Sequence, residues 1–204
     1  MSEALQFPED FMHCVRFHGH ICPGLSIGYR AAKAGLDHMS TKRSEDEELV
    51  AIVETDACGA DAVQVLTGCT FGKGNFLYQD RGKQAFTLID RSTGQGVRLC
   101  MRPDGFGPEG RHQELLRRVM QDQASEQERE EFFALHQEAS KKVLDMPLED
   151  LFSMQTGEFP IPDMARIDAS RCCDECGEPT MQSKLVQAQD RLLCRGCIDS
   201  YRLL

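Results

Sequence analysis

Two histidines and a cysteine lie close together near the start of the sequence, in the segment FHGHICPG at residues 17–24. Side chains at alternate positions of an extended segment point to the same side, so His18, His20 and Cys22 would converge. Imidazole nitrogen and thiolate sulfur are donors that suit zinc and other soft divalent ions. The spacing therefore predicts a metal or thiol site here.

A second cysteine has similar surroundings. Cys22 precedes Pro23, which suits the first position of a helix, and Cys58 follows a strand-like run and precedes a predicted helix. A cysteine at the start of a helix meets unpaired amides and the positive end of the helix dipole, and both lower the pKa of its thiol. Cys58 is thus expected to join the site, with Asp61 nearby. Either thiolate would then be a candidate nucleophile or redox centre.

Four cysteines near the other end form two CxxC pairs, Cys173 with Cys176 and Cys194 with Cys197, separated by seventeen residues. This spacing is typical of a four-cysteine zinc site, in which each pair forms a tight knuckle and a hairpin joins the knuckles. The alternatives are a redox-active CxxC, which lacks the usual βαβ context here, and free thiols. Cys172 is either an alternative ligand or an exposed thiol.

The remaining histidines and most other cysteines show no convergent partners, and we expect them to be ordinary core or polar residues: Cys14, Cys100, His13, His38, His112 and His136. The segment GCTFGKGN resembles a phosphate-binding loop but has the wrong glycine spacing and lacks the serine or threonine that binds magnesium. We interpret its glycines as permitting a tight turn.

Charge and composition exclude some classes of function. The chain has 204 residues, a formal net charge of −10 and ten cysteines. A general nucleic-acid binder would carry a basic surplus, so nucleic acid is an unlikely partner. No apolar run is long enough to cross a membrane, and the first residues do not resemble a signal peptide. We expect a cytoplasmic protein with reduced thiols that does not associate with membranes.

Hydrophobic periodicity and turn residues predict an α+β protein. Strand-like runs are expected at 49–55, 83–90 and 96–102, and helices at 8–17, 23–39, 59–67, 111–121 and 125–146. Two prolines, at 160 and 162, indicate an extended linker. The predicted organisation is a core domain at 1–155, a linker at 156–169 and a zinc-finger domain at 170–204, with a hairpin formed by 181–187 and 191–193.

The sequences FHGHICPGLSIGYRAAKAGL and VETDACGADAVQVLTGCTFGKGN resemble the signature of the FmdE family, which is named after a component of formylmethanofuran dehydrogenase. The later cysteine segments resemble the zinc-finger extension of its two-domain members. The resemblance implies a thioredoxin-like core with a mixed, five-stranded sheet and a treble-clef zinc finger. It also implies a metal in the core, and it transfers to six positions of this sequence: His18, His20, Cys22, Cys58, Asp61 and Cys69.

These observations give three groups of candidate residues. The core metal ligands are His18, His20, Cys22, Cys58 and Cys69, the catalytic candidates are Cys22, Cys58, His20 and Asp61, and the structural zinc ligands are Cys173, Cys176, Cys194 and Cys197. The expected cofactors are a structural zinc ion and a second divalent metal in the core.

Three hypotheses for function follow. The first is an enzyme of one-carbon metabolism in anaerobes, associated with molybdenum or tungsten formylmethanofuran dehydrogenase. The second is a non-catalytic accessory or metal-delivery protein for such an oxidoreductase, docking through its zinc finger. The third, a nucleic-acid regulator, is the weakest because residues 170–204 carry equal numbers of basic and acidic residues. A homodimer is the expected assembly.

Overall fold

The computed structural model describes residues 5–202. The chain divides into two compact units, Met1–Met164 and Ala165–Leu204. We call the first the core domain and the second the finger domain.

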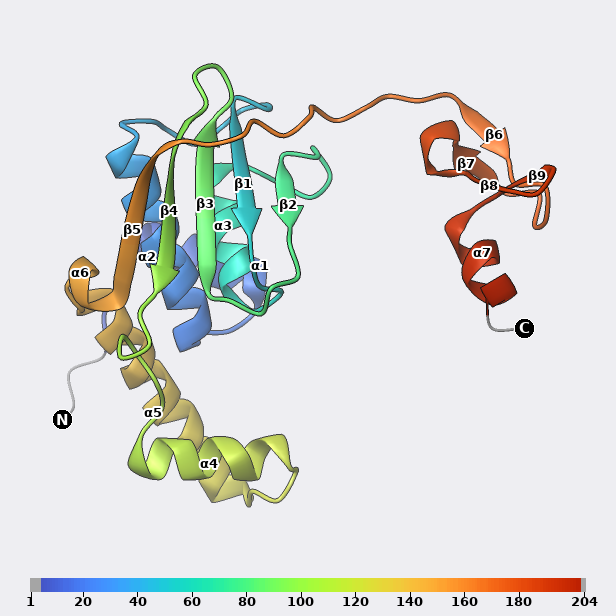
Figure 1. The fold of residues 1–204 in the computed structure, drawn as a ribbon. Helices are drawn as coiled ribbons and strands as arrows, with labels where there is room; N and C mark the ends of the chain where they lie inside the picture. The colour runs from blue at the N-terminus through green and yellow to red at the C-terminus, as the bar shows by residue number, and fades with distance from the viewer. Residues whose placement is uncertain (1–4, 203–204) are drawn as a thin grey trace. The chain divides into compact units, whose positions relative to one another are not determined.

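The core domain is built on a five-stranded sheet (Figure 1). The strand order is β2-β1-β3-β4-β5; β1 and β2 are parallel, and the other neighbours are antiparallel. The strands are β1 (Leu49–Val53), β2 (Phe76–Tyr78), β3 (Ala85–Asp90), β4 (Gln95–Met101) and β5 (Phe152–Glu158). The predicted α+β class with a mixed sheet is confirmed.

One face of the sheet is covered by helices α1 (Glu9–His18), α2 (Pro23–His38) and α3 (Gly59–Thr67) (Figure 1). Alternate residues of the strands point to this face and pack with α2 and α3 into the main core, among them Ala51, Phe86 and Leu99. A smaller apolar cluster joins α1 to α2 through Phe11, Leu25 and Tyr29. These contacts fix the ends of the three helices relative to one another.

Helices α2 and α3 approach each other through glycine. A Cβ atom added at Gly28 would lie 2.1 Å from the carbonyl oxygen of Gly59, and one added at Gly24 would lie 3.3 Å from Cβ of Cys58. Only residues without a side chain permit this separation of the two backbones. The contact brings the start of α3 next to the first turns of α2.

Two strands were not predicted, β2 and β5. β2 has three residues, too few for an alternating pattern, and four consecutive residues of β5, at 153–156, are exposed, so neither has a clear apolar period. Residues 156–158, which are predicted to lie in the linker, pair with β4 and belong to the sheet. The reason is that backbone hydrogen bonds, not apolar side chains, hold this edge strand.

The second face of the sheet carries a buried ion pair. Arg98 of β4 donates from Nε to Oε1 of Glu54 at 2.7 Å, and only 2% of the Glu54 side chain is exposed. The segment that follows β5 passes across this face (Figure 1). Its Phe159 amide donates to the carbonyl of Gly94 at 2.8 Å.

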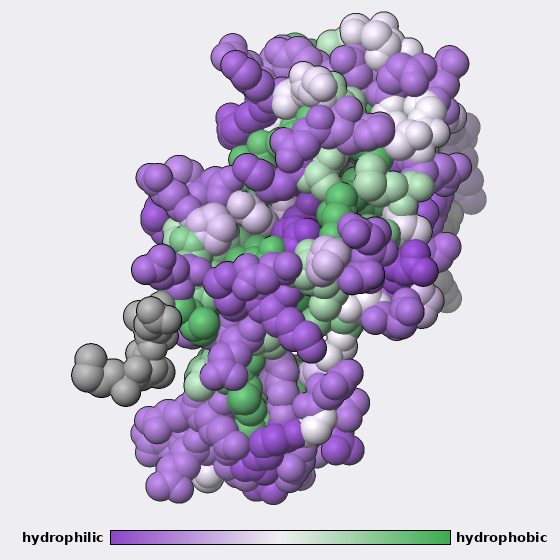
Figure 2. Space-filling view, turned by 90° about the vertical axis from the view of Figure 1, so that its left-hand side faces the viewer, coloured by the Kyte–Doolittle hydropathy of each residue, from purple (hydrophilic) through white to green (hydrophobic). Residues whose placement is uncertain are grey.

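Helices α4 (Gly110–Met120) and α5 (Glu126–Asp145) form a hairpin, followed by the short α6 (Leu148–Leu151). The predicted capping box at the start of α5 is present, with Ser125 and Glu128 bonded reciprocally. Figure 2 shows mostly hydrophilic groups on this side, with apolar groups between them over α4 and α5. Met120 and Phe133 are the exposed large apolar residues of these two helices.

The finger domain contains two short hairpins and a helix: β6 (Ser170–Cys172) with β7 (Pro179–Met181), β8 (Val186–Ala188) with β9 (Arg191–Leu193), and α7 (Arg195–Arg202). The expected strand at 181–187 is wrong in its first half, because Gln182–Lys184 forms a 3-10 turn. The hairpin before it was not predicted, since its strands are three residues long. No described helix has the length and apolar character needed to span a membrane.

We predict that Gly28→Ala destabilises the core domain. Alanine would favour the helix by about 1 kcal/mol, but its Cβ would meet the backbone of Gly59, which cannot move aside as a side chain can. Overpacking of this kind costs about 1–3 kcal/mol, so urea unfolding should show a net loss. Gly72→Ala is the control, because nothing lies within 4 Å of its added Cβ. Equal stability of the two variants would contradict the close contact.

Stability should also depend on pH through Glu54. The hydrogen bond from Arg98 lowers the pKa of this carboxyl group below its usual value, against the opposing effect of burial. The ionised carboxylate therefore contributes stability above the unfolded pKa of about 4.5, and this contribution is lost as pH falls through the lower folded pKa. The stability difference between wild type and Glu54→Gln should shrink between pH 7 and pH 3, whereas Glu158→Gln, at an exposed position, should show no such trend. A difference that stays constant with pH would be inconsistent with the ion pair.

Candidate metal centres

His18 and His20 come from the end of α1 and the turn after it. His18 is the last residue of the helix, and Gly19 takes a left-handed conformation with φ of 101°, its amide donating to the carbonyl of Val15 at 2.7 Å. This is a helix end of the kind that glycine favours. The expected extended segment is therefore wrong, but the turn still brings the two imidazoles together, with ring centroids 4.4 Å apart.

Cys22 caps the start of α2. Its backbone is extended, and its Sγ accepts a hydrogen bond from the amide of Leu25 at 3.3 Å, while Pro23 occupies the first turn as predicted. The residue is buried, with 4% exposure. Cys58 occupies the corresponding position before α3 and lies against Gly24. Two helix starts thus present two sulfur atoms to the end of a third helix.

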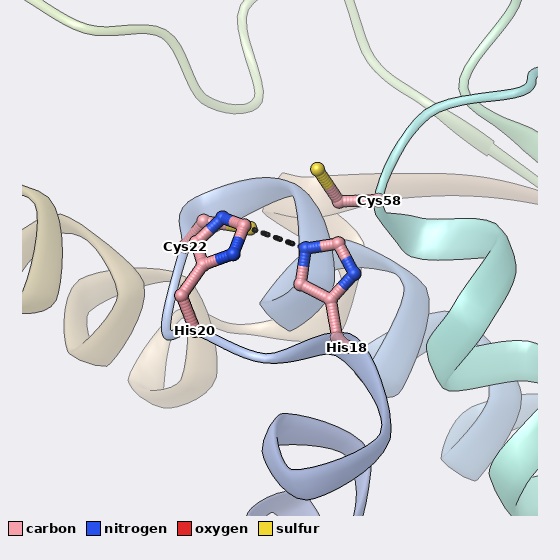
Figure 3. A group of neighbouring side chains, drawn as sticks. All are labelled: His18, His20, Cys22 and Cys58. Carbon is pink, nitrogen blue, oxygen red and sulfur yellow. Dashed lines mark hydrogen bonds between the residues drawn. The ribbon is translucent and has the colours of Figure 1, made fainter.

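The donor atoms of His18, His20, Cys22 and Cys58 all lie within 4.8 Å of one another (Figure 3). Nε2 of His18 is 3.7 Å from Sγ of Cys22. Tetrahedral zinc with bonds of about 2.0–2.3 Å places its donor atoms roughly 3.3–3.8 Å apart. The donor set and spacing therefore fit a tetrahedral ion such as zinc after small side-chain movements.

Asp61 holds the imidazole of His18 in position. Its Oδ2 lies 2.7 Å from Nδ1 of His18. A carboxylate at one ring nitrogen keeps the proton there and leaves Nε2 with a lone pair for a metal. The structure therefore places Asp61, a predicted catalytic residue, behind a ligand.

The two thiols differ in acidity. Hydrogen bonding between them lowers the pKa of Cys58 to about 5, helped by nearby His18, and raises the pKa of Cys22 well above its usual value, with burial adding to the increase. The expectation that both helix starts yield acidic thiols is thus wrong for Cys22, because one proton shared by a close pair stays on the more buried sulfur. Without a metal, Cys58 is the thiolate.

The structure does not bring Cys69 to this group. Its thiol is fully buried among core residues beyond the end of α3 and donates to the carbonyl of Leu49 at 3.4 Å. Burial raises its pKa. The resemblance transferred this residue along with its motif, but it is part of the packing of α3 on β1.

The four cysteines of the finger domain also converge, with all four sulfur atoms within 4.8 Å of one another. Sγ of Cys176 is 3.9 Å from Sγ of Cys194, and the amide of Cys194 donates to Sγ of Cys173 at 3.2 Å. This backbone hydrogen bond is the main reason that the pKa of Cys173 is lowered to about 6. Cys172 is exposed on β6 and is not a member of the group. The cluster can bind a metal such as zinc.

One pair of histidines was missed. His112 of α4 and His136 of α5 lie with ring nitrogens 2.9 Å apart, although the sequence suggested isolated residues. Burial lowers the pKa of both, that of His136 to about 4, where the charges of His112 and His20 contribute as well. The two residues are on different helices, so no spacing in the sequence could have revealed the pair.

These features define a two-domain α+β protein with a histidine–cysteine group in its core domain and a four-cysteine group in its finger domain. The chain belongs to the FmdE family, whose sequence model, described as "FmdE, Molybdenum formylmethanofuran dehydrogenase operon", matches residues 17–153. The four core ligands all lie inside this range.

Two known proteins are similar to the chain. A crystal structure of an FmdE-like protein of tungsten formylmethanofuran dehydrogenase, from Syntrophus aciditrophicus, is 26% identical, with a TM-score of 0.59 and coverage of 96% of this chain and 94% of that one. A probable S-adenosyl-L-methionine-binding protein from Archaeoglobus fulgidus is 31% identical over 194 residues, which are 91% of this chain. The chain spans only 51% of that relative.

We predict that Asp61→Asn weakens metal binding in the core domain. The amide can still accept from His18 but no longer supports its basicity by charge, so zinc affinity should fall about 10- to 100-fold in competition with a chelator. Asp37→Asn, at an exposed position of α2, is the control. Equal core affinity in both variants would show that Asp61 does not support a ligand.

Proposed function

We propose that this protein is a metal-binding FmdE protein that serves one-carbon metabolism of the molybdenum or tungsten formylmethanofuran dehydrogenase type in anaerobes. The functional site is the group of His18, His20, Cys22 and Cys58. The observation that carries the proposal is the convergence of these four donors from the ends of three helices. A convergence of this kind is built by the fold and would be costly to keep without a ligand.

Exposure divides the four residues into two kinds. Cys22 is buried and also fixed by the amide of Leu25, whereas His20 is exposed to solvent. His20 is therefore the ligand that can leave most readily and admit water or a substrate. A bound divalent ion would supply Lewis acidity, while Asp61 keeps the proton of His18 on Nδ1.

A second candidate is delivery of a metal to an oxidoreductase. It is favoured by the completeness of the set, because four protein donors leave no open position on a tetrahedral ion. An exposed ligand such as His20 also suits exchange of the ion with a partner. Under this proposal the finger domain docks the partner, and the protein acts as a cytoplasmic homodimer; the free state of all ten cysteines supports a reducing compartment.

Metal analysis of the intact protein tests the proposal. We expect two ions per chain in wild type, one in His20→Ala with the finger ion retained, and one in Cys197→Ser with the core ion retained. His13→Ala, an exposed histidine of α1 outside the group, should keep both ions. A wild-type protein that holds a single ion, lost only in Cys197→Ser, would contradict a functional metal in the core domain.

A further inference from the structure

A cavity of about 380 Å³ lies on the second face of the core sheet, away from the metal centre. Its floor includes Ile52, Thr87 and Arg98, which face one another across β1, β3 and β4. Its remaining wall is the segment at 159–162. The volume is within the range of about 300–1,000 Å³ that small-molecule sites occupy.

The wall of this cavity is held in place by specific contacts. Phe159 lies directly over Gly96, where an added Cβ would be 3.0 Å from its ring. The guanidinium of Arg91 donates to the carbonyl of Pro162, at the other end of the segment. The segment is therefore anchored at both ends, and the space beneath it is a built feature of the fold.

The charged groups of the cavity do not balance. Glu54 is matched by two guanidinium groups, because Arg81 lies beside Arg98 on the same carboxylate oxygen. Arg98 is close to that oxygen at 2.7 Å, but Arg81 reaches it only at 3.4 Å, and 53% of the Arg81 side chain is exposed. The cavity thus carries one net positive charge, and Arg81 has hydrogen-bonding capacity to spare.

Glu54 is also incompletely satisfied. Its Oε2 is buried and has no hydrogen-bond partner among the described residues, although Oε1 has two. A buried carboxylate oxygen without a donor is costly. A ligand that offers an N–H or O–H group would remove this cost.

We propose that this cavity binds a small organic monoanion whose carboxylate pairs with Arg81, whose apolar body packs between Ile89 and Phe159, and whose hydroxyl or amino group donates to Glu54. The guanidinium fork of arginine matches a carboxylate in charge and in geometry. The inference goes beyond the proposed function and does not rest on it, since none of the metal ligands lines the cavity. Glu54 lies only four residues before Cys58, so one short segment joins the two sites.

The experiment is a titration of the isotopically labelled, zinc-loaded full chain with 4-hydroxybenzoate, followed by amide NMR. The uncharged 4-hydroxybenzamide has nearly the same shape and is the matched probe. We expect saturable shifts at Ile52, Thr87 and Arg98 with the carboxylate, and at least tenfold weaker binding of the amide, the ratio that corresponds to about one charge-assisted hydrogen bond.

Arg81→Gln should weaken binding of 4-hydroxybenzoate about tenfold, and it should fold normally because the side chain is half exposed. Arg102→Gln, another half-exposed arginine that is not in the cavity, should bind as wild type. The inference is overturned by the absence of saturable binding, by equal affinity for both probes, or by an affinity that Arg81→Gln leaves unchanged. Shifts at the same amides that depend on protein concentration without any probe would also overturn it, because a second copy would then cover this face.

Discussion

The core metal centre depends on the close approach of α2 and α3 at Gly28 and Gly59. With a Cβ at Gly28 only 2.1 Å from a backbone oxygen, neither helix could keep its position if that residue had a side chain. The approach brings Cys58 against Gly24 and next to Cys22, and the turn at Gly19 then adds the two histidines. Backbone packing, which is present before any metal binds, therefore determines where the donors meet.

The two metal centres have different physical origins. The core donors are fixed by helix ends that are anchored in an apolar core, so metal can bind and leave without unfolding the domain. The finger domain has few buried residues apart from Cys173 and Leu193, and a domain so small relies on its metal for much of its folding energy. A closed set of four sulfurs suits that structural role, whereas the mixed core set with an exposed His20 suits exchange or reaction.

Much of this arrangement could be predicted from the sequence, and the failures have physical causes. Cys173, Cys176, Cys194 and Cys197 were found from spacing alone, because a CxxC knuckle is a local structure. The core group was found although its backbone was not: His18 ends a helix instead of lying in an extended segment. Cys69 was included because its motif is close in sequence, but it is in the apolar core, and the His112–His136 pair and strand β5 were missed because both depend on contacts between distant segments.

The central claim is that His18, His20, Cys22 and Cys58 bind a metal of their own. It is tested most directly by zinc-edge X-ray absorption on the full chain with Cys194 and Cys197 both replaced by serine, so that the finger group is disabled. We predict a bound ion coordinated by equal numbers of sulfur and imidazole nitrogen atoms, with bond lengths of about 2.3 and 2.0–2.1 Å. A sample without bound zinc, or an ion surrounded by oxygen, would contradict it.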